Sequence, residues 1–101
     1  MAADVPRHAV WMALEVSDQA LYARYRARIA PILDSFGGRF EHDFRVAEVL
    51  HSSAGERVNR VFALSFPDRA SRARFFADPR YRAIRTELFE PAVASATQLA
   101  E

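Results

Sequence analysis

The segment VFALSFPDRASRARFFADPRYRAI, residues 61–84, determines the fold more than any other part of the sequence. Its first six residues alternate in the way typical of a strand, and Pro67 ends that strand. Asp68 can cap a helix by accepting the first free amide protons. Pro79 lacks an amide proton and fixes its own φ, so it suits the first turn of a new helix directly after the capping residue Asp78. The segment therefore predicts a strand followed by two helical pieces.

Similar signals divide the rest of the chain. Residues 8–16 are apolar and β-prone, and they end where Ser17 or Asp18 can cap a helix. Apolar side chains then recur at helical spacing until Gly37, which supplies the left-handed ending that helices favour. Further strands are predicted over residues 38–50, 57–66 and 93–101. The order βαββαβ predicts an α+β, ferredoxin-like fold, in which a four-stranded antiparallel sheet carries two helices on one face.

Composition limits the functions open to the chain. A length of 101 residues predicts a single domain over residues 1–101. The 14 basic side chains nearly match the 13 acidic ones, which argues against nucleic acid as a partner. There is no cysteine for disulfide or thiol chemistry. Neither a basic leader nor a long apolar run is present, so we expect no membrane contact and a cytoplasmic location.

A ferredoxin-like sheet leaves one face without helices, and here that face is expected to be apolar. Alternation along the first and third strands places six side chains there: Trp11, Ala13, Glu15, Val61, Ala63 and Ser65. This surface is too apolar for open water. A symmetric homodimer that stacks two sheets is the simplest way to cover it.

The same uncovered face is the predicted functional site. Alternation along the second strand places Asp43 and Arg45 on this face with Glu15, while Phe40 and Phe44 pack against the helices. A buried carboxylate could abstract a proton from a small organic acid or aromatic compound while an arginine holds the anion. The candidate catalytic residues are Glu15, Asp43 and Arg45, and the candidate ligand-binding residues are Trp11, Arg39, Glu41, Asn59 and Ser65. The alternative interpretation is an ion-pair lattice at the dimer seam.

The histidines and glycines give no sign of a metal or cofactor site. His42 alternates with Phe40 and Phe44, so it is expected to point towards the helices as a hydrogen-bonded core residue. The other histidines are not spaced as metal ligands, so no metal is expected. Three glycines cannot build a phosphate-binding loop, and no cofactor is expected.

Four stretches of the chain, EVSDQALYARYR, FGGRFE, VFALSFPDRASRARFFADPRYRAI and FEPAVASATQLAE, together carry a family resemblance. The chain resembles the dimeric α/β-barrel superfamily, and most closely its domain-of-unknown-function family number thirteen-thirty. The resemblance implies a homodimer whose two sheets face one another around a cavity. Relatives bind small molecules or act as cofactor-free monooxygenases, isomerases or decarboxylating enzymes, and no catalytic residue carries over.

One departure from that family and two functional hypotheses follow. After the glycine pair the family has further glycines, whereas this chain continues as EHDFRVAEVL, which implies a longer, more charged second strand at the cavity mouth. The first hypothesis is a small-molecule-binding protein that is a cofactor-free enzyme of the monooxygenase or isomerase type. The alternative is a non-catalytic dimeric ligand-binding or scaffold protein.

Overall fold

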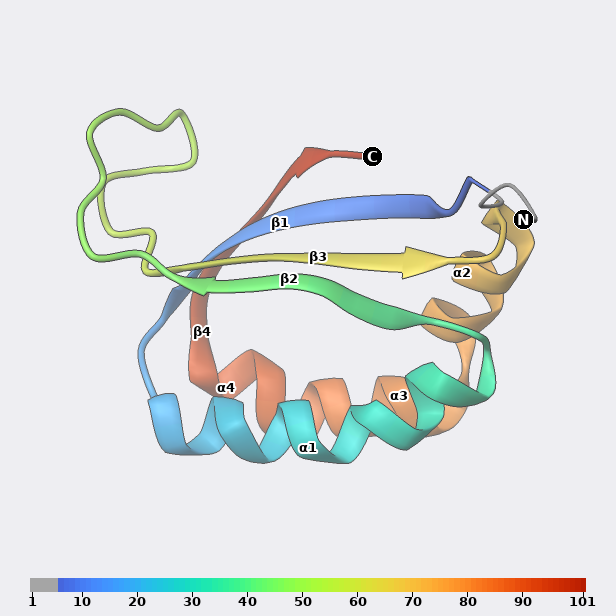
Figure 1. Ribbon diagram of the computed structural model, residues 1–101. Coiled ribbons are helices and arrows are strands. Elements are labelled where there is room, and N and C mark those ends of the chain that lie inside the picture. The colour runs from blue at the N-terminus through green and yellow to red at the C-terminus, as the bar shows by residue number, and fades with distance from the viewer. Residues whose placement is uncertain (1–5) are drawn as a thin grey trace.

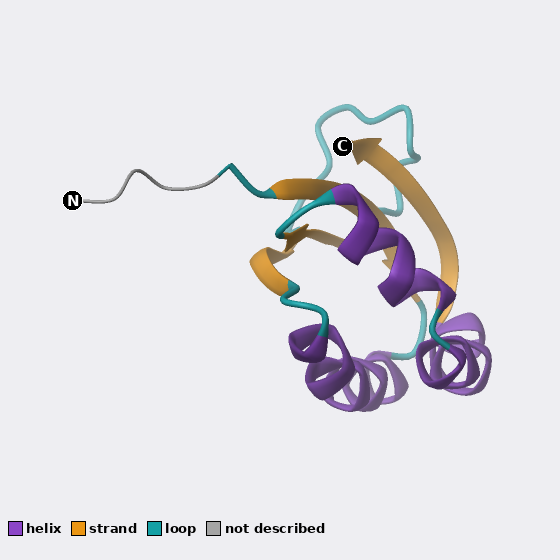
Figure 2. Ribbon diagram, turned by 90° about the vertical axis from the view of Figure 1, so that its right-hand side faces the viewer, coloured by secondary structure: helices purple, strands orange, loops and turns teal. Residues whose placement is uncertain are grey.

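The computed structural model describes residues 6–101 and confirms the ferredoxin-like α+β fold (Figure 1). Its strands form one sheet in the order β2-β3-β1-β4, with every neighbouring pair antiparallel. The strands are β1 (His8–Val16), β2 (Arg39–Arg45), β3 (Arg60–Phe66) and β4 (Val93–Ala100). The helical segments are α1 (Gln19–Ser35), α2 (Arg69–Ala77), α3 (Pro79–Ile84), η1 (Arg85–Phe89) and α4 (Glu90–Ala92). The helices lie against one face of the sheet, here called the inner face, and the other face is called the outer face (Figure 2).

The helix ends confirm the capping predictions. The side chains of Asp18, Asp68 and Asp78 accept hydrogen bonds from backbone amides in the first turns of α1, α2 and α3. Pro79 occupies the start of α3, where its missing amide proton costs nothing. Gly37 follows α1 with a φ of +71°, a left-handed conformation that favours glycine. Within residues 6–101, no helix combines the length and apolar character needed to cross a membrane.

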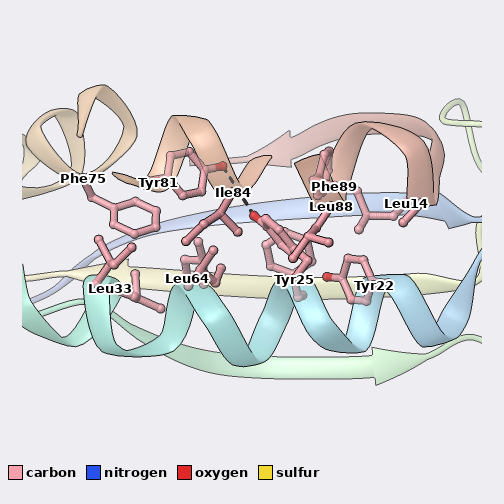
Figure 3. Close-up of a cluster of buried hydrophobic side chains, with 14 of the residues drawn as sticks. Leu14, Tyr22, Tyr25, Leu33, Leu64, Phe75, Tyr81, Ile84, Leu88 and Phe89 are labelled. Carbon is pink, nitrogen blue, oxygen red and sulfur yellow. Dashed lines mark hydrogen bonds between the residues drawn. The ribbon is translucent and has the colours of Figure 1, made fainter. Parts of the chain in front are cut away.

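The hydrophobic core lies between the inner face and the helices (Figure 3). Leu14 and Leu64 project from the sheet, whereas Tyr25 comes from α1 and Phe75 from α2. All four are at most 5% exposed. At the edge of this core, the hydroxyl groups of Tyr25 and Tyr81 meet across the gap between α1 and α3 (Figure 3). This pair places two hydroxyl groups in a mainly apolar interior.

The second helical region widens into a π-helical turn, η1. The amide of Glu90 donates to the carbonyl of Arg85, five residues earlier. Pro91 follows inside the helix and has no N–H to donate to the preceding turn, so a regular α-helical ladder is already interrupted there. Both Leu88 and Phe89 are buried in the core by this wide turn.

A β-bulge in β2 reverses the predicted faces of the side chains in the second half of that strand. Phe40 pairs with Leu64, but the next pair is His42 with Ala63, so Glu41 is an extra residue. Because side chains alternate with period two, one extra residue exchanges the two faces for the rest of the strand. Two predictions are therefore wrong: His42 and Phe44 lie on the outer face. Phe44 is 51% exposed rather than packed under the helices.

The second strand is also shorter than predicted. It ends at Arg45 rather than continuing to residue 50, and β3 begins only at Arg60. Residues 46–59 form the long loop that projects beyond the sheet in green and yellow (Figure 1). Leu50 is 89% exposed in this loop.

Candidate functional site

The structure does not bring the predicted catalytic residues together. Glu15 lies on the outer face, because it alternates with Leu14 and Val16, which are buried in the core. Asp43 and Arg45 follow the bulge and therefore lie on the inner side of the sheet. The predicted grouping of these residues on one face is wrong, and the reason is the single extra residue at Glu41.

Asp43 instead joins a group of ion pairs beneath the sheet. Its carboxylate accepts a hydrogen bond of 2.9 Å from Nε of Arg60, and its other oxygen lies 2.7 Å from Nε of Arg26. The Arg60 guanidinium also lies 4.8 Å from the centre of the Tyr22 ring. Burial raises the pKa of Tyr22 to about 12, so its hydroxyl stays protonated. Arg45, the other relocated residue, is exposed.

Three of the predicted ligand-binding residues do meet on the outer face. Ser65 and Arg39 both donate to the same oxygen of Glu41, at 2.7 and 2.6 Å. Nε of Arg7 donates to the Ser65 hydroxyl at 2.8 Å. The hydrogen bond from Ser65, followed by that from Arg39, lowers the pKa of the Glu41 carboxyl. These groups satisfy one another's hydrogen-bonding capacity within one chain.

Trp11 belongs to a row of aromatic rings on the outer face. Its ring stacks on His42 with centroids 5.1 Å apart, and His42 stacks on Phe44 at 5.5 Å. The row joins β1 to β2 across β3, where the small side chain of Ala63 leaves room. His42 is thus part of an aromatic surface and not of the core.

The remaining predicted ligand-binding residue, Asn59, has a structural position. Its side-chain amide donates to the carbonyl of Val16 at 2.9 Å, and its side-chain oxygen accepts from the Val16 amide at 2.8 Å. The side chain thereby takes the place of a backbone unit and extends the pairing of β1 beyond the start of β3. Asn59 does not lie free on the outer face.

A cavity of about 540 Å³ opens on the inner side, between the sheet and the segments α2, α3 and η1. Its buried floor is mainly apolar and consists of Val10, Tyr25, Phe62, Leu64, Tyr81 and Phe89. Its more exposed rim consists of Met12, Arg72, Phe76, Arg82, Arg85, Thr86, Glu90, Ala96 and Gln98. This volume is within the range of pockets that hold small molecules.

Two phenols provide hydrogen bonds on the cavity floor. The hydroxyl of Tyr25 donates to that of Tyr81 over 3.4 Å. Burial, reinforced by the neighbouring Tyr81, raises the pKa of Tyr25 well above its usual range. Both rings line the cavity and come from different helices (Figure 3). A phenol hydroxyl can donate as well as accept, so this pair can offer a proton to a ligand oxygen.

Positive charge prevails at the cavity rim. Arg85 pairs with Glu90 at 3.1 Å, and Arg72 pairs with Glu101 at 2.8 Å. Arg82 forms no ion pair with any residue in the range 6–101. Since the lining contains three arginines and one glutamate, the rim favours an anion. Over the same range, no group of three potential metal ligands comes together.

Sequence reasoning missed this cavity. Helical spacing alone favours a solvated helix face for Arg82 and Arg85, and a core-facing position for Tyr81. A signal was present, because Tyr25 and Tyr81 place hydroxyl groups at core positions on two helices that pack together.

The comparisons with known proteins agree with this architecture. A family model described as a domain of unknown function, DUF1330, matches residues 9–98. The chain belongs to the DUF1330 family. The predicted family resemblance is confirmed, and a search of curated proteins found no match for this DUF1330 chain.

Solved structures show the same fold at low sequence identity. A protein of unknown function from Rhodopseudomonas palustris is 19% identical, with a TM-score of 0.72, over 90% of this chain and 78% of that one. A dabb family protein with a ferredoxin-like fold from Mesorhizobium loti is 16% identical, with a TM-score of 0.65, over 95% and 96%. A NIPSNAP domain protein from Burkholderia xenovorans is 17% identical, with a TM-score of 0.61, over 91% and 90%. At these identities the likeness concerns the fold alone.

Proposed function

We propose that this protein binds a small organic acid with an apolar or aromatic body in the cavity between the sheet and the helices. The carrying observation is the cavity itself, which combines an apolar floor, a pair of phenols and an arginine-rich rim. An apolar body would lie on the floor, and the acid group would face the rim. Guanidinium groups bind carboxylates through charge-assisted hydrogen bonds.

The cavity favours binding over catalysis. A general base must accept a proton near the operating pH. The raised pKa keeps Tyr25 protonated at neutral pH, so it donates a hydrogen bond rather than removing a proton. Glu90, the carboxylate of the lining, is exposed and paired with Arg85. The binding function is therefore better supported than cofactor-free monooxygenase or isomerase chemistry.

Titration with benzoate, phenylacetate and octanoate tests this function. Calorimetry gives the affinity, and amide resonances in heteronuclear NMR spectra locate the contact. We expect at least one acid to bind and to shift resonances of α2, α3, η1 and the inner residues of β1. If no acid binds, or if the shifts are confined to the outer face, the proposed function is wrong.

Replacing Arg82 with glutamine is expected to weaken phenylacetate binding by about threefold, because the cavity rim loses one positive charge. Arg82 is exposed, so the fold should not change. Arg24→Gln is the matched control, since Arg24 is exposed on α1 and lies outside the cavity lining. Calorimetry on both variants checks the result. Equal affinities for the two variants would remove Arg82 from the site.

We also propose that the protein is a homodimer whose outer faces pack together. The aromatic row formed by Trp11, His42 and Phe44 presents an apolar surface there, and Phe44 is 51% exposed. Isolated sheets rarely leave such a surface in water. A two-fold axis would place one row against the other and cover both.

Light scattering across a dilution series tests the dimer. The wild-type chain is expected to have twice the 11.4 kDa mass of one chain. Phe44→Glu should give a folded monomer, because it places a charge in each half of the apolar contact. Leu50→Glu is the control, since Leu50 is exposed in the loop of residues 46–59 and its replacement should leave the dimer intact. A folded wild-type monomer at all concentrations would contradict the proposal.

A further inference from the structure

One carboxylate of the chain is already bound at the edge of the cavity. An oxygen of Glu101 accepts a hydrogen bond of 2.8 Å from Nη1 of Arg72, and its other oxygen accepts one of 3.2 Å from the Gln98 amide. Nη1 of Arg69 lies 3.3 Å from the first oxygen. Three side chains from two elements thus converge on one carboxylate.

Two of these three groups also line the cavity. Arg72 and Gln98 belong to its rim, on α2 and on the inner face of β4. Arg72 is also held in place by His8, since the same Nη1 lies 2.9 Å from Nε2 of His8, and this nitrogen lies 3.8 Å from the Glu101 carboxylate. A guanidinium group only donates, so this histidine nitrogen accepts. The binding site of the Glu101 carboxylate is therefore continuous with the cavity and partly preorganised.

We propose that Arg72, Gln98 and Arg69 form a carboxylate-binding subsite, and that the carboxylate of an organic-acid ligand replaces Glu101 there. This inference rests on the proposed function and names which end of the cavity receives the acid group. Glu101 acts as an internal competitor, because its side chain holds the donors that the ligand needs. The hydrogen bond from Arg72 lowers the pKa of Glu101, so the competing group is ionised at neutral pH.

Because Glu101 competes for the subsite, the apparent association constant of a ligand equals its intrinsic constant multiplied by the fraction of molecules in which the subsite is free. The Glu101 side chain is 38% exposed, so its ion pairs are screened and its hold on Arg72 is modest. Removing its charge should therefore tighten the binding of an acid by about fivefold. A neutral ligand of the same shape should not gain, because it does not use the charge of Arg72.

The test compares phenylacetate with phenylacetamide on the full chain by calorimetry, with NMR spectra to locate binding. Glu101→Gln should tighten phenylacetate about fivefold and leave phenylacetamide unchanged. Glu87→Gln is the matched control, because Glu87 pairs with Arg28 away from the cavity. In an Arg72→Gln background, adding Glu101→Gln should produce no further gain. The NMR signals of the His8 ring should shift when phenylacetate binds the wild-type chain.

Two outcomes overturn the inference, and they differ in what else they overturn. The first outcome is that phenylacetate binds in the cavity with equal affinity to the wild type and to Glu101→Gln, or that the amide gains as much as the acid. The replacement of Glu101 by the ligand carboxylate is then wrong, and the binding function stands. The second outcome is that neither compound shifts cavity resonances in any variant. The replacement of Glu101 by a ligand and the proposed binding function are then both wrong.

Discussion

Replacing Phe75 with alanine is expected to destabilise the protein by about 3–5 kcal/mol. The Phe75 side chain is fully buried, and its ring lies within 5.6 Å, centre to centre, of Phe66, Phe76 and Tyr81. Truncation loses these contacts and leaves a cavity. The neighbouring segments β3, α2 and α3 are packed on one another and cannot easily move to fill it. A domain of this size has a total stability of about 5–15 kcal/mol, so the loss is large. Chemical denaturation followed by circular dichroism gives the value.

Phe44→Ala is the matched control for that experiment. The sequence predicted a core position for Phe44, but the structure places it 51% exposed on the outer face. Any loss of stability should then arise from the proposed dimer contact and should decrease as the protein is diluted. The Phe75→Ala loss, in contrast, originates within one chain. Equal and concentration-independent losses for the two variants would contradict the placement of Phe44.

Replacing Asp43 with asparagine is expected to cost about 2–4 kcal/mol, the second-largest effect. The substitution keeps the shape of the side chain but leaves Arg26 and Arg60 without their shared carboxylate. The Arg60 side chain is only 14% exposed, so water replaces the lost partner poorly. Denaturation in urea is the suitable measurement, because it adds no ionic screening.

Asp34→Asn provides the comparison for Asp43→Asn. Asp34 is exposed in α1, so its change should alter the stability by less than about 0.5 kcal/mol. Asp43→Asn should leave phenylacetate binding intact, because Asp43 does not line the cavity. A variant that stays as stable as the wild type but loses ligand binding would return Asp43 to the functional site.

Local chemistry explains why the fold was predictable. The capping residues Asp18, Asp68 and Asp78, together with Pro79 and Gly37, act through their own backbone neighbourhood. Each therefore marks an element boundary whatever the rest of the chain does. Alternation along β1 is equally local, because that strand keeps one phase from Val10 to Val16.

The site could not be predicted in the same way. The position of Asp43 depends on how β2 aligns with β3, and residues 39–45 contain no glycine or proline that would mark a bulge. The cavity depends on side chains from α1, α2, α3, η1 and three strands. Helical periodicity identifies Tyr25 and Tyr81 as inward-facing. It does not distinguish a side chain that fills the core from one that borders a cavity.

The extra residue at Glu41 has a practical consequence for transferring sequence between relatives. A deletion of this one residue would remove the bulge and still leave Asp43 on the inner side beside Arg26 and Arg60, because His42 would then follow Phe40 in simple alternation. The inward and outward alternation of side chains after the bulge is thus offset by one residue from the alternation before it. A chimera that exchanges β2 residue by residue with a homologue of different length would mix these two alternations. The segment from Arg39 to Arg45 should therefore be exchanged as one unbroken piece.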